Sequence, residues 1–203
     1  MSDFFSQEWL PWVIAGSVVA IGFVGWLIRR RGRGSDLQQV LDAIGYDRID
    51  GVLIPNGDDG EIQIDHLLLT SRGLLIVDVK EVSGTVFGGD KLDNWTVISD
   101  QHRFTFSNPQ PALYDRVAAV RHIVRQVPVE GRLVFLDGAE FTKGTPDGVT
   151  DVATLDREFR ETDRDAGKFK IEAFKPHWDQ IRKAALNIEL GEQYGAPMKS
   201  DAD

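Results

Sequence analysis

Two aspartates and a lysine, Asp65, Asp78 and Lys80, lie in a stretch whose pattern predicts two neighbouring strands. Residues 61–70 and 74–81 are rich in β-branched and aliphatic side chains, and a Ser-Arg-Gly turn sequence separates them. Carboxylate oxygens are the ligands that hard divalent cations prefer, and a lysine beside them adds positive charge without binding the metal. If the strands pair, the three side chains would form a metal site.

The length of the turn decides which residues meet across this predicted hairpin. A two-residue loop would place Asp65 opposite Asp78 and Gln63 opposite Lys80, all on one face of the sheet. The other face would carry Ile62, Ile64, His66 and Leu68 against Leu75, Val77, Val79 and Glu81. Both faces would then be largely apolar, which predicts a hairpin in the middle of its sheet.

Two carboxylates at such a position need a compensating charge. At a cross-strand separation of roughly 5 Å they repel each other, and burial of each ion costs several kcal/mol. A divalent cation would compensate both. Two alternatives stay open: a three-residue loop would put His66 opposite Asp78, or Asp65 and Asp78 could lie at a solvated hairpin end with Lys80 as an ordinary counter-ion.

The amino-terminal segment predicts a membrane anchor. The run from Trp9 to Ile28 has 20 residues without a charge, enough to cross a bilayer once. Four arginines follow within residues 29–33, an order opposite to that of a cleaved signal peptide. Arginines on this side predict that the rest of the chain is cytoplasmic, at the inner membrane if the source is bacterial. Gly16 and Ala20 have the small-residue spacing of paired spans and weakly favour a homodimer.

The composition excludes some kinds of metal site and argues against one class of nucleic-acid binder. The chain has no cysteine, which excludes disulfide partners and thiolate metal sites. From Ser35 onward there are 19 Lys and Arg against 30 Asp and Glu, a net charge of about 11 negative. This charge opposes a non-specific nucleic-acid binder, although a local basic groove or a metal ion could still hold phosphates.

The sequence predicts one α/β domain after the span. The predicted strands are residues 48–55, 61–70, 74–81, 84–87, 95–99, 102–106 and 132–136, and the predicted helices are residues 37–44, 111–127, 155–162 and 177–188. The predicted organisation is a short non-cytoplasmic terminus (1–8), the transmembrane helix (9–28), a basic juxtamembrane linker (29–36), the folded domain (37–190) and a polar tail (191–203).

The chain resembles the nuclease-related domain family, a branch of the PD-(D/E)xK nuclease superfamily, most closely from Val52 to Gly88. The resemblance rests on the segments Gln63-Ile64-Asp65-His66, Gly73, Val77-Asp78-Val79-Lys80, Ser83-Gly84, Phe87-Gly88, Trp95 and Asn108-Pro109, with weaker similarity through residues 134–146. It implies a restriction-endonuclease-like mixed β-sheet flanked by helices.

The same resemblance implies roles for individual residues. Asp65, Asp78 and the Val79 carbonyl would bind Mg²⁺ or Mn²⁺, and Lys80 would orient the attacking water or stabilise charge on the phosphate. The substrate would be DNA or RNA. The chemistry suits these residues, because the metal can activate water and neutralise phosphate charge.

The chain departs from the family pattern around this centre. Its second acid is Asp78, shorter than the alternative glutamate, and Asp36-Leu37 replaces a Gly-Glu near the first helix. The usual glutamine after Asn-Pro is Ala112 here, with Gln110 nearby. Asp36, Gln110 and Gln63 are therefore the candidate accessory residues.

Two functions follow as hypotheses. The first is a membrane-anchored, metal-dependent nuclease, with Asp65, Asp78 and Lys80 as its catalytic residues. The second is a catalytically inactive, membrane-tethered binding module of the same fold, since a fold alone does not establish chemistry. Of the other residues, His66 is expected to be a core or hydrogen-bonded histidine, Trp95 a core aromatic, and Asn108 a helix cap.

Overall fold

The computed structural model describes residues 36–57, 60–100, 102–136, 138–161 and 164–194. The predicted span from Trp9 to Ile28 and the linker up to residue 35 lie outside these residues. Within the described part, none of the helices combines the length and apolar character needed to cross a membrane. The chain divides into two compact units, Met1–Gln38 and Gln39–Asp203.

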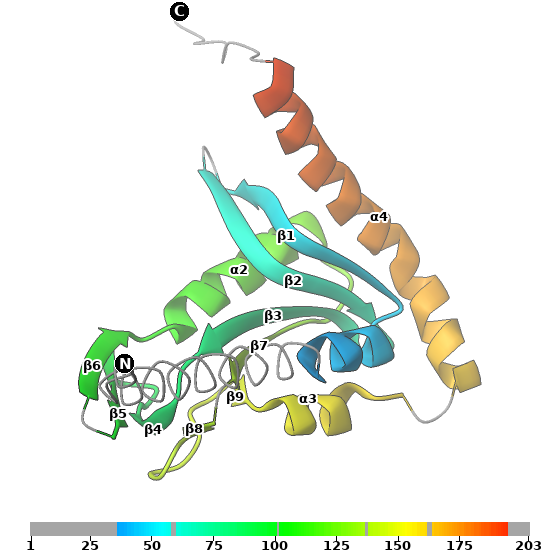
Figure 1. Ribbon diagram of the computed structural model, residues 1–203. Helices are drawn as coiled ribbons and strands as arrows, with labels where there is room; N and C mark the ends of the chain where they lie inside the picture. The colour runs from blue at the N-terminus through cyan, green and yellow to red at the C-terminus, as the bar shows by residue number, and fades with distance from the viewer. Residues whose placement is uncertain (1–35, 58–59, 101, 137, 162–163, 195–203) are drawn as a thin grey trace, which may run out of the picture. The chain divides into compact units, whose positions relative to one another are not determined.

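A five-stranded sheet positions the candidate site (Figure 1). Its strands, in spatial order, are β1 (Asp47–Asn56), β2 (Gly60–Thr70), β3 (Gly73–Glu81), β7 (Val129–Leu136) and β9 (Val149–Thr150). β1, β2 and β3 are antiparallel neighbours, whereas β7 runs parallel to β3 and β9 runs parallel to β7. The predicted hairpin therefore lies inside the sheet, with β3 flanked on both sides.

A second, four-stranded sheet follows β3 along the chain. Its spatial order is β6 (His102–Ser107), β5 (Asn94–Ser99), β4 (Gly84–Phe87) and β8 (Ala139–Glu140). The single mixed sheet expected from the sequence is thus two mixed sheets. The break falls at Gly84, whose φ of 117° suits glycine and whose added Cβ would lie 2.5 Å from the Ile98 carbonyl oxygen.

The helices are residues 36–44, α2 (Gln110–Ile123), α3 (Val152–Phe159) and α4 (Arg164–Tyr194). The prediction for α4 was too short, because the helix continues through Pro176. A proline removes one helical hydrogen bond, but buried Ile171 and Trp178 on either side of it hold the helix against the sheet. Packing therefore overrides the stop signal.

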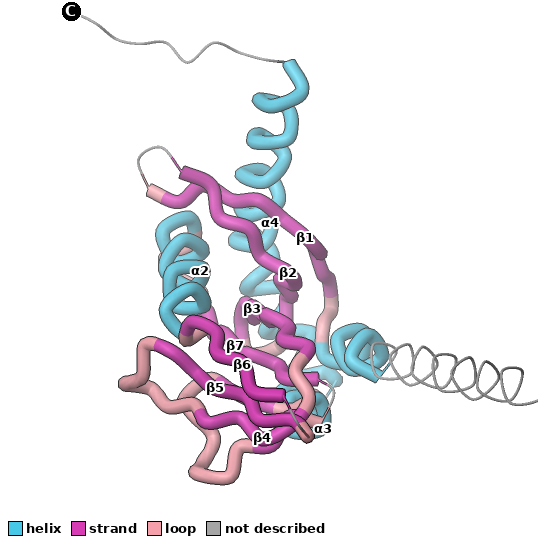
Figure 2. Tube along the Cα trace, turned by 60° about the vertical axis from the view of Figure 1, so that its left-hand side comes forward, coloured by secondary structure: helices cyan, strands magenta, loops and turns pink. Residues whose placement is uncertain are grey.

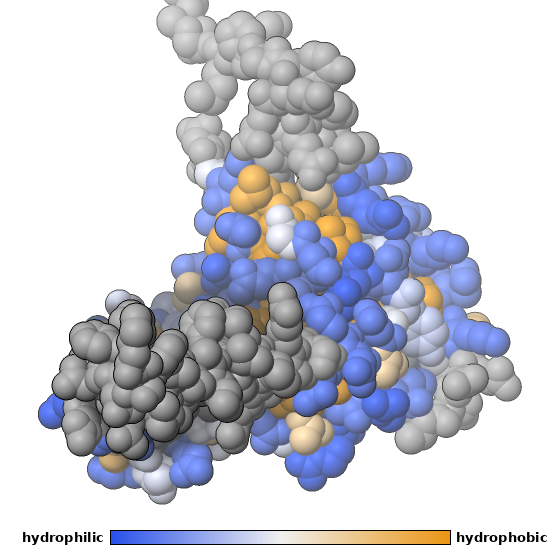
Figure 3. Space-filling view, viewed as in Figure 1, coloured by the Kyte–Doolittle hydropathy of each residue, from blue (hydrophilic) through white to orange (hydrophobic). Residues whose placement is uncertain are grey.

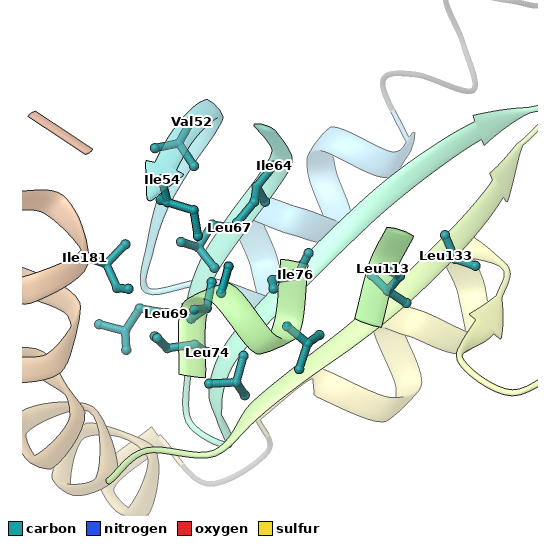
Figure 4. Packing of buried hydrophobic residues seen from close by; sticks show 14 of the residues in the cluster. Val52, Ile54, Ile64, Leu67, Leu69, Leu74, Ile76, Leu113, Leu133 and Ile181 are labelled. Atoms are coloured by element: carbon teal, nitrogen blue, oxygen red, sulfur yellow. The ribbon is translucent and has the colours of Figure 1, made fainter. Parts of the chain in front are cut away.

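One face of the five-stranded sheet is covered by α2 and α4 (Figures 1 and 2). Figure 4 shows their apolar side chains meeting those of the strands. The buried cluster includes Val52, Ile54, Ile64, Leu67, Leu69, Leu74, Ile76, Leu113, Leu133 and Ile181. Trp178 and Arg182 of α4 also donate to Asp47 Oδ2 at 2.8 and 2.9 Å. The helix α2 itself contacts β2 and β3, the strands that carry the two aspartates.

The β1 and β2 hairpin is apolar beyond its contact with β3. Figure 3 shows orange, hydrophobic atoms gathered over this region on the face seen in Figure 1.

The smaller sheet has its own aromatic core, in which Trp95 is fully buried and its ring stacks 6.0 Å from that of Phe135. The prediction that Trp95 is a core aromatic is confirmed.

Candidate metal centre

The turn between β2 and β3 has two residues, so the predicted register is confirmed. Thr70 pairs with Gly73 and the ladder continues to the pair of His66 with Val77. Gly73 has a φ of 127°, and the Thr70 hydroxyl donates to its carbonyl at 2.9 Å. The alternative of a three-residue loop is wrong. Asp65 and Asp78 are the next residues of their strands beyond the last pair.

The strands separate at this point. The pairing of β1 with β2 passes from Asp50–His66 directly to Val52–Ile64, and Gly51 between them has a φ of 63°. The β1 and β2 hairpin bends here and curves away from β3 (Figure 1). Asp65 therefore sits at a bend, where a side chain has room between diverging strands.

The predicted pairing of Gln63 with Lys80 is not formed, because the ladder between β2 and β3 ends at the pair of His66 with Val77. Gln63 is paired with Leu53 on the β1 side, and Lys80 with Phe135 on the β7 side. Strict alternation of faces also fails, because Ile62 and Ile64 pack with the same core as Leu67. The reason is physical: alternation holds only while the strand stays regular.

The two carboxylates differ in their surroundings. Asp65 is half-buried, and its Oδ2 accepts the Val79 N–H in a long hydrogen bond of 3.4 Å. Asp78 is buried, with a relative exposure of 1%. Its Oδ1 has no hydrogen-bond partner among the described residues. A buried carboxylate oxygen without a donor is costly unless a cation satisfies it.

Arg116 is a residue of this site that the sequence reasoning missed. It extends from α2 and places Nη1 3.2 Å from Asp78 Oδ2. Its Nε donates to the Gln63 carbonyl oxygen at 2.7 Å. The signal was present in the sequence, since Arg116 lies three residues after Leu113 and four before Val120, within the apolar stripe of the helix. A charged residue in such a stripe indicates a buried partner.

Burial and the neighbouring positive charges change the pKa of Asp78 in opposite directions. Desolvation raises the pKa of Asp78, and the Asp65 carboxylate raises it further. Arg116, Lys80 and His66 lower it, but they do not offset the burial. Lys80 is half-buried two residues along β3 and contributes its charge through space. Burial therefore makes the charged form of Asp78 less favourable than it is in water, and added positive charge would favour that form.

The candidate accessory residues lie in different places. The side chain of Gln63 is exposed, and only its carbonyl contacts Arg116. Gln110 is buried and donates to Asp90 Oδ1 at 2.7 Å and to the Asp147 carbonyl at 2.8 Å, which ties two loops to the start of α2. Asp36 is exposed in the helix 36–44. A role for any of them at the metal stays a prediction.

The prediction for His66 is confirmed, since its Nδ1 lies 2.7 Å from Asp50 Oδ1. The predicted cap is displaced by one residue: Pro109 is the N-cap of α2, and Asn108 before it accepts the Gln110 N–H through Oδ1 at 2.9 Å. Its amide also donates to the Leu92 carbonyl at 2.9 Å. Both side chains are thus occupied by structural contacts.

The donor set fits a hard divalent cation. Asp65 and Asp78 are carboxylates on adjacent strands, and the free Oδ1 of Asp78 is the kind of buried atom that a cation satisfies. Among the described residues, no group of three acidic, histidine or cysteine side chains is close enough to hold a metal alone. The remaining ligands would be water, a carbonyl such as that of Val79, or substrate oxygens, as is common for Mg²⁺.

A family model and one relative match parts of the chain. The family model of the nuclease-related domain matches residues 34–136. An uncharacterized protein of Bacillus anthracis is 26% identical over 86 residues, which are 42% of this chain and 41% of that protein. The chain thus spans less than half the length of this relative. No solved structure matches the chain.

Proposed function

Because the chain belongs to the nuclease-related domain family, we propose that it is a metal-dependent nuclease. One observation carries the proposal: Asp65 and Asp78 follow directly on the last pair of the β2–β3 ladder, and the buried Oδ1 of Asp78 has no donor among the described residues. Mg²⁺ or Mn²⁺ is the proposed cofactor. We also propose that Trp9 to Ile28 anchors the chain, so that it acts at the cytoplasmic face of a membrane.

The proposed ligands are Asp65, Asp78 and the Val79 carbonyl. A bound divalent cation would lower the pKa of a coordinated water and neutralise charge on the scissile phosphate. The two aspartates fix its position because they project from adjacent strands of a packed sheet. Burial of Asp78 excludes bulk water from one side of the site, which strengthens every charge interaction in it.

Lys80 is proposed to act on the reacting groups. Its ammonium lies close enough to Asp78 to influence that carboxylate, so it can hold the attacking water and stabilise negative charge on the phosphate oxygens. In the hydrolysis, the water oxygen bonds to phosphorus and the ester bond opposite breaks. The leaving oxygen takes a proton from solvent, and the proton lost by the attacking water passes to solvent.

A basic surface on α2 supports a nucleic-acid substrate. An open hollow of about 540 Å³ is lined by Tyr114, Val117, Ala118, Arg121, His122 and Arg125. The arginines, the histidine and the half-exposed Tyr114 are groups that contact phosphates and bases. Because the chain as a whole is acidic, a local basic surface of this kind is what a phosphate backbone needs.

The test is cleavage of labelled single- and double-stranded DNA and RNA with Mg²⁺, Mn²⁺ or EDTA. We expect cutting that depends on the metal and is lost in Asp78→Ala and in Lys80→Ala. The two variants should separate the roles: Lys80→Ala should still bind Mn²⁺, whereas Asp78→Ala should not. Cutting that survives both substitutions would exclude this site as the catalytic centre.

A membrane-tethered binding module without catalysis is the second candidate. The ion pair of Arg116 with Asp78 favours it, because a guanidinium already supplies part of the charge that a metal would bring. Ala112 in place of the usual family glutamine favours it as well. Thermal stability distinguishes the two. Mg²⁺ at 100 times its Kd should stabilise a metal-binding fold by about 2.7 kcal/mol, whereas the module should show no shift.

A further inference from the structure

Arg116 occupies an unusual position for a residue next to a metal site. Its guanidinium contacts Asp78 Oδ2 at 3.2 Å and the Gln63 carbonyl at 2.7 Å. It therefore bridges β3, which carries one proposed ligand, and the arm of β2 that begins at the other. The bridge spans the gap that opens at the bend.

We propose that Arg116 is a built-in cation that competes with the divalent metal for Asp78 and leaves that carboxylate when the metal binds. The inference rests on the proposed metal site, and it assigns Arg116 a positioning role, since it acts through Asp78. Two positive charges on one buried carboxylate repel each other, so the guanidinium and the metal each weaken the binding of the other.

The contacts of Arg116 allow such an exchange. Its side chain is 21% exposed, against 2% for that of Asp78, so the guanidinium can turn toward solvent while the carboxylate stays. The hydrogen bond to the Gln63 carbonyl holds the arginine through a different atom, Nε, and can persist when Nη1 releases Asp78. Asp78 Oδ1 offers a cation a first contact before the arginine leaves, because it has no partner in the described part of the chain.

This arrangement explains how a buried aspartate is tolerated without metal. A carboxylate with 1% exposure and no cation beside it would be strongly unfavourable. Arg116 supplies that cation from a neighbouring helix, at the cost of weaker metal binding. Arg116 thus stabilises the metal-free fold and lowers the affinity of Asp78 for the metal.

The experiment is calorimetric titration of Mn²⁺ into the full-length chain, kept in mild detergent because residues 9–28 are apolar. It compares wild type with Arg116→Met, and it is run at about pH 8 because metal ligands must first lose their protons. Arg116→Lys is the conservative variant, and Arg103→Met, at an exposed position on β6, is the matched control.

A neighbouring opposite charge changes the proton affinity of a carboxylate by about 10- to 1000-fold, and we expect a similar effect on a competing metal ion. Arg116→Met should lower the Kd for Mn²⁺ by about ten-fold or more. Arg116→Lys should lie between it and wild type, and Arg103→Met should match wild type. If Arg116→Met does not fold, Arg116→Gln, which can still contact the Gln63 carbonyl, serves the same comparison.

The outcomes separate this inference from the proposed function. Tighter Mn²⁺ binding in Arg116→Met supports the competition, whether or not either protein cleaves nucleic acid. Binding that appears only in Arg116→Met supports it too, and shows that the arginine blocks the site. Equal or weaker binding in a folded Arg116→Met overturns the inference while leaving the nuclease intact. Absence of Mn²⁺ binding in all variants overturns both.

Discussion

Gly73 sets the register on which the whole site depends, so its substitution is the sharpest structural prediction. An added Cβ would lie 2.3 Å from the Pro128 carbonyl oxygen, which accepts the Leu74 N–H at 2.9 Å. The φ of 127° is also a conformation that other residues rarely adopt. Such backbone strain costs about 1–3 kcal/mol, and loss of the hydrogen bond with its groups left unpaired costs about 1–3 kcal/mol more.

Gly73→Ala should therefore lower the free energy of unfolding by about 2–6 kcal/mol, with a midpoint of about 4 kcal/mol. Gly57→Ala is the matched control, because Gly57 also has a positive φ, 70°, but nothing lies within 4 Å of its added Cβ. It should cost only about 1–2 kcal/mol. At roughly 2–4 °C per kcal/mol for a domain of this size, the two melting temperatures should differ by about 5–10 °C.

The assay is urea unfolding of the full-length variants, followed by the fluorescence of buried Trp95 and Trp178. A second measurement is Mn²⁺ binding in buffer without urea. A folded Gly73→Ala with a shifted turn would place His66 opposite Asp78 and should bind Mn²⁺ more weakly. If Gly73→Ala were as stable as Gly57→Ala and bound Mn²⁺ like wild type, the argument from the turn would be refuted.

Three further predictions concern separate parts of the chain. Hydrogen bonds from Gln110 and the Asp147 N–H lower the pKa of Asp90, so the stability they add is present above about pH 3.8 and is lost as pH falls through the folded-state pKa. The difference in melting temperature between wild type and Asp90→Asn should accordingly shrink in acid, and a constant difference would contradict it. Arg125→Ala should weaken nucleic-acid binding and reduce the slope of log K against log salt by about 1; an unchanged slope would remove Arg125 from the binding surface. Deletion of residues 1–34 should release the protein from membranes in a fractionation experiment, and a deleted chain that still sediments with them would contradict the anchor.

Part of the site could be predicted from the sequence because it depends on local chemistry. The turn sequence ending in Gly73 favoured a two-residue loop but left a three-residue loop open, and the structure shows the two-residue loop. The rest depends on geometry that no local pattern carries. The φ of Gly51 bends the hairpin at Asp65 and separates Gln63 from Lys80.

The position of α2 over the sheet is the second feature that local sequence patterns do not predict. It brings Arg116 to Asp78 across 38 positions of the sequence, through packing of Leu113 and its neighbours on β7. The sequence pattern also predicted too short a helix for α4, because Pro176 lies inside the observed helix. The sequence predicted a helix at residues 111–127, and the charged Arg116 within its apolar stripe was the clue that this helix meets a buried partner.

The central claim is that Asp65 and Asp78 form the metal site of a nuclease. The most direct measurement is the cleavage rate of nucleic acid by the full-length chain as Mn²⁺ is titrated, for wild type, Asp65→Asn, Asp78→Asn and the control Asp115→Asn, which alters an exposed carboxylate on α2. We expect metal-dependent cleavage by wild type and by Asp115→Asn, and no cleavage by Asp65→Asn or Asp78→Asn. Equal cleavage in all four, or none by a folded wild type that binds Mn²⁺, would contradict it.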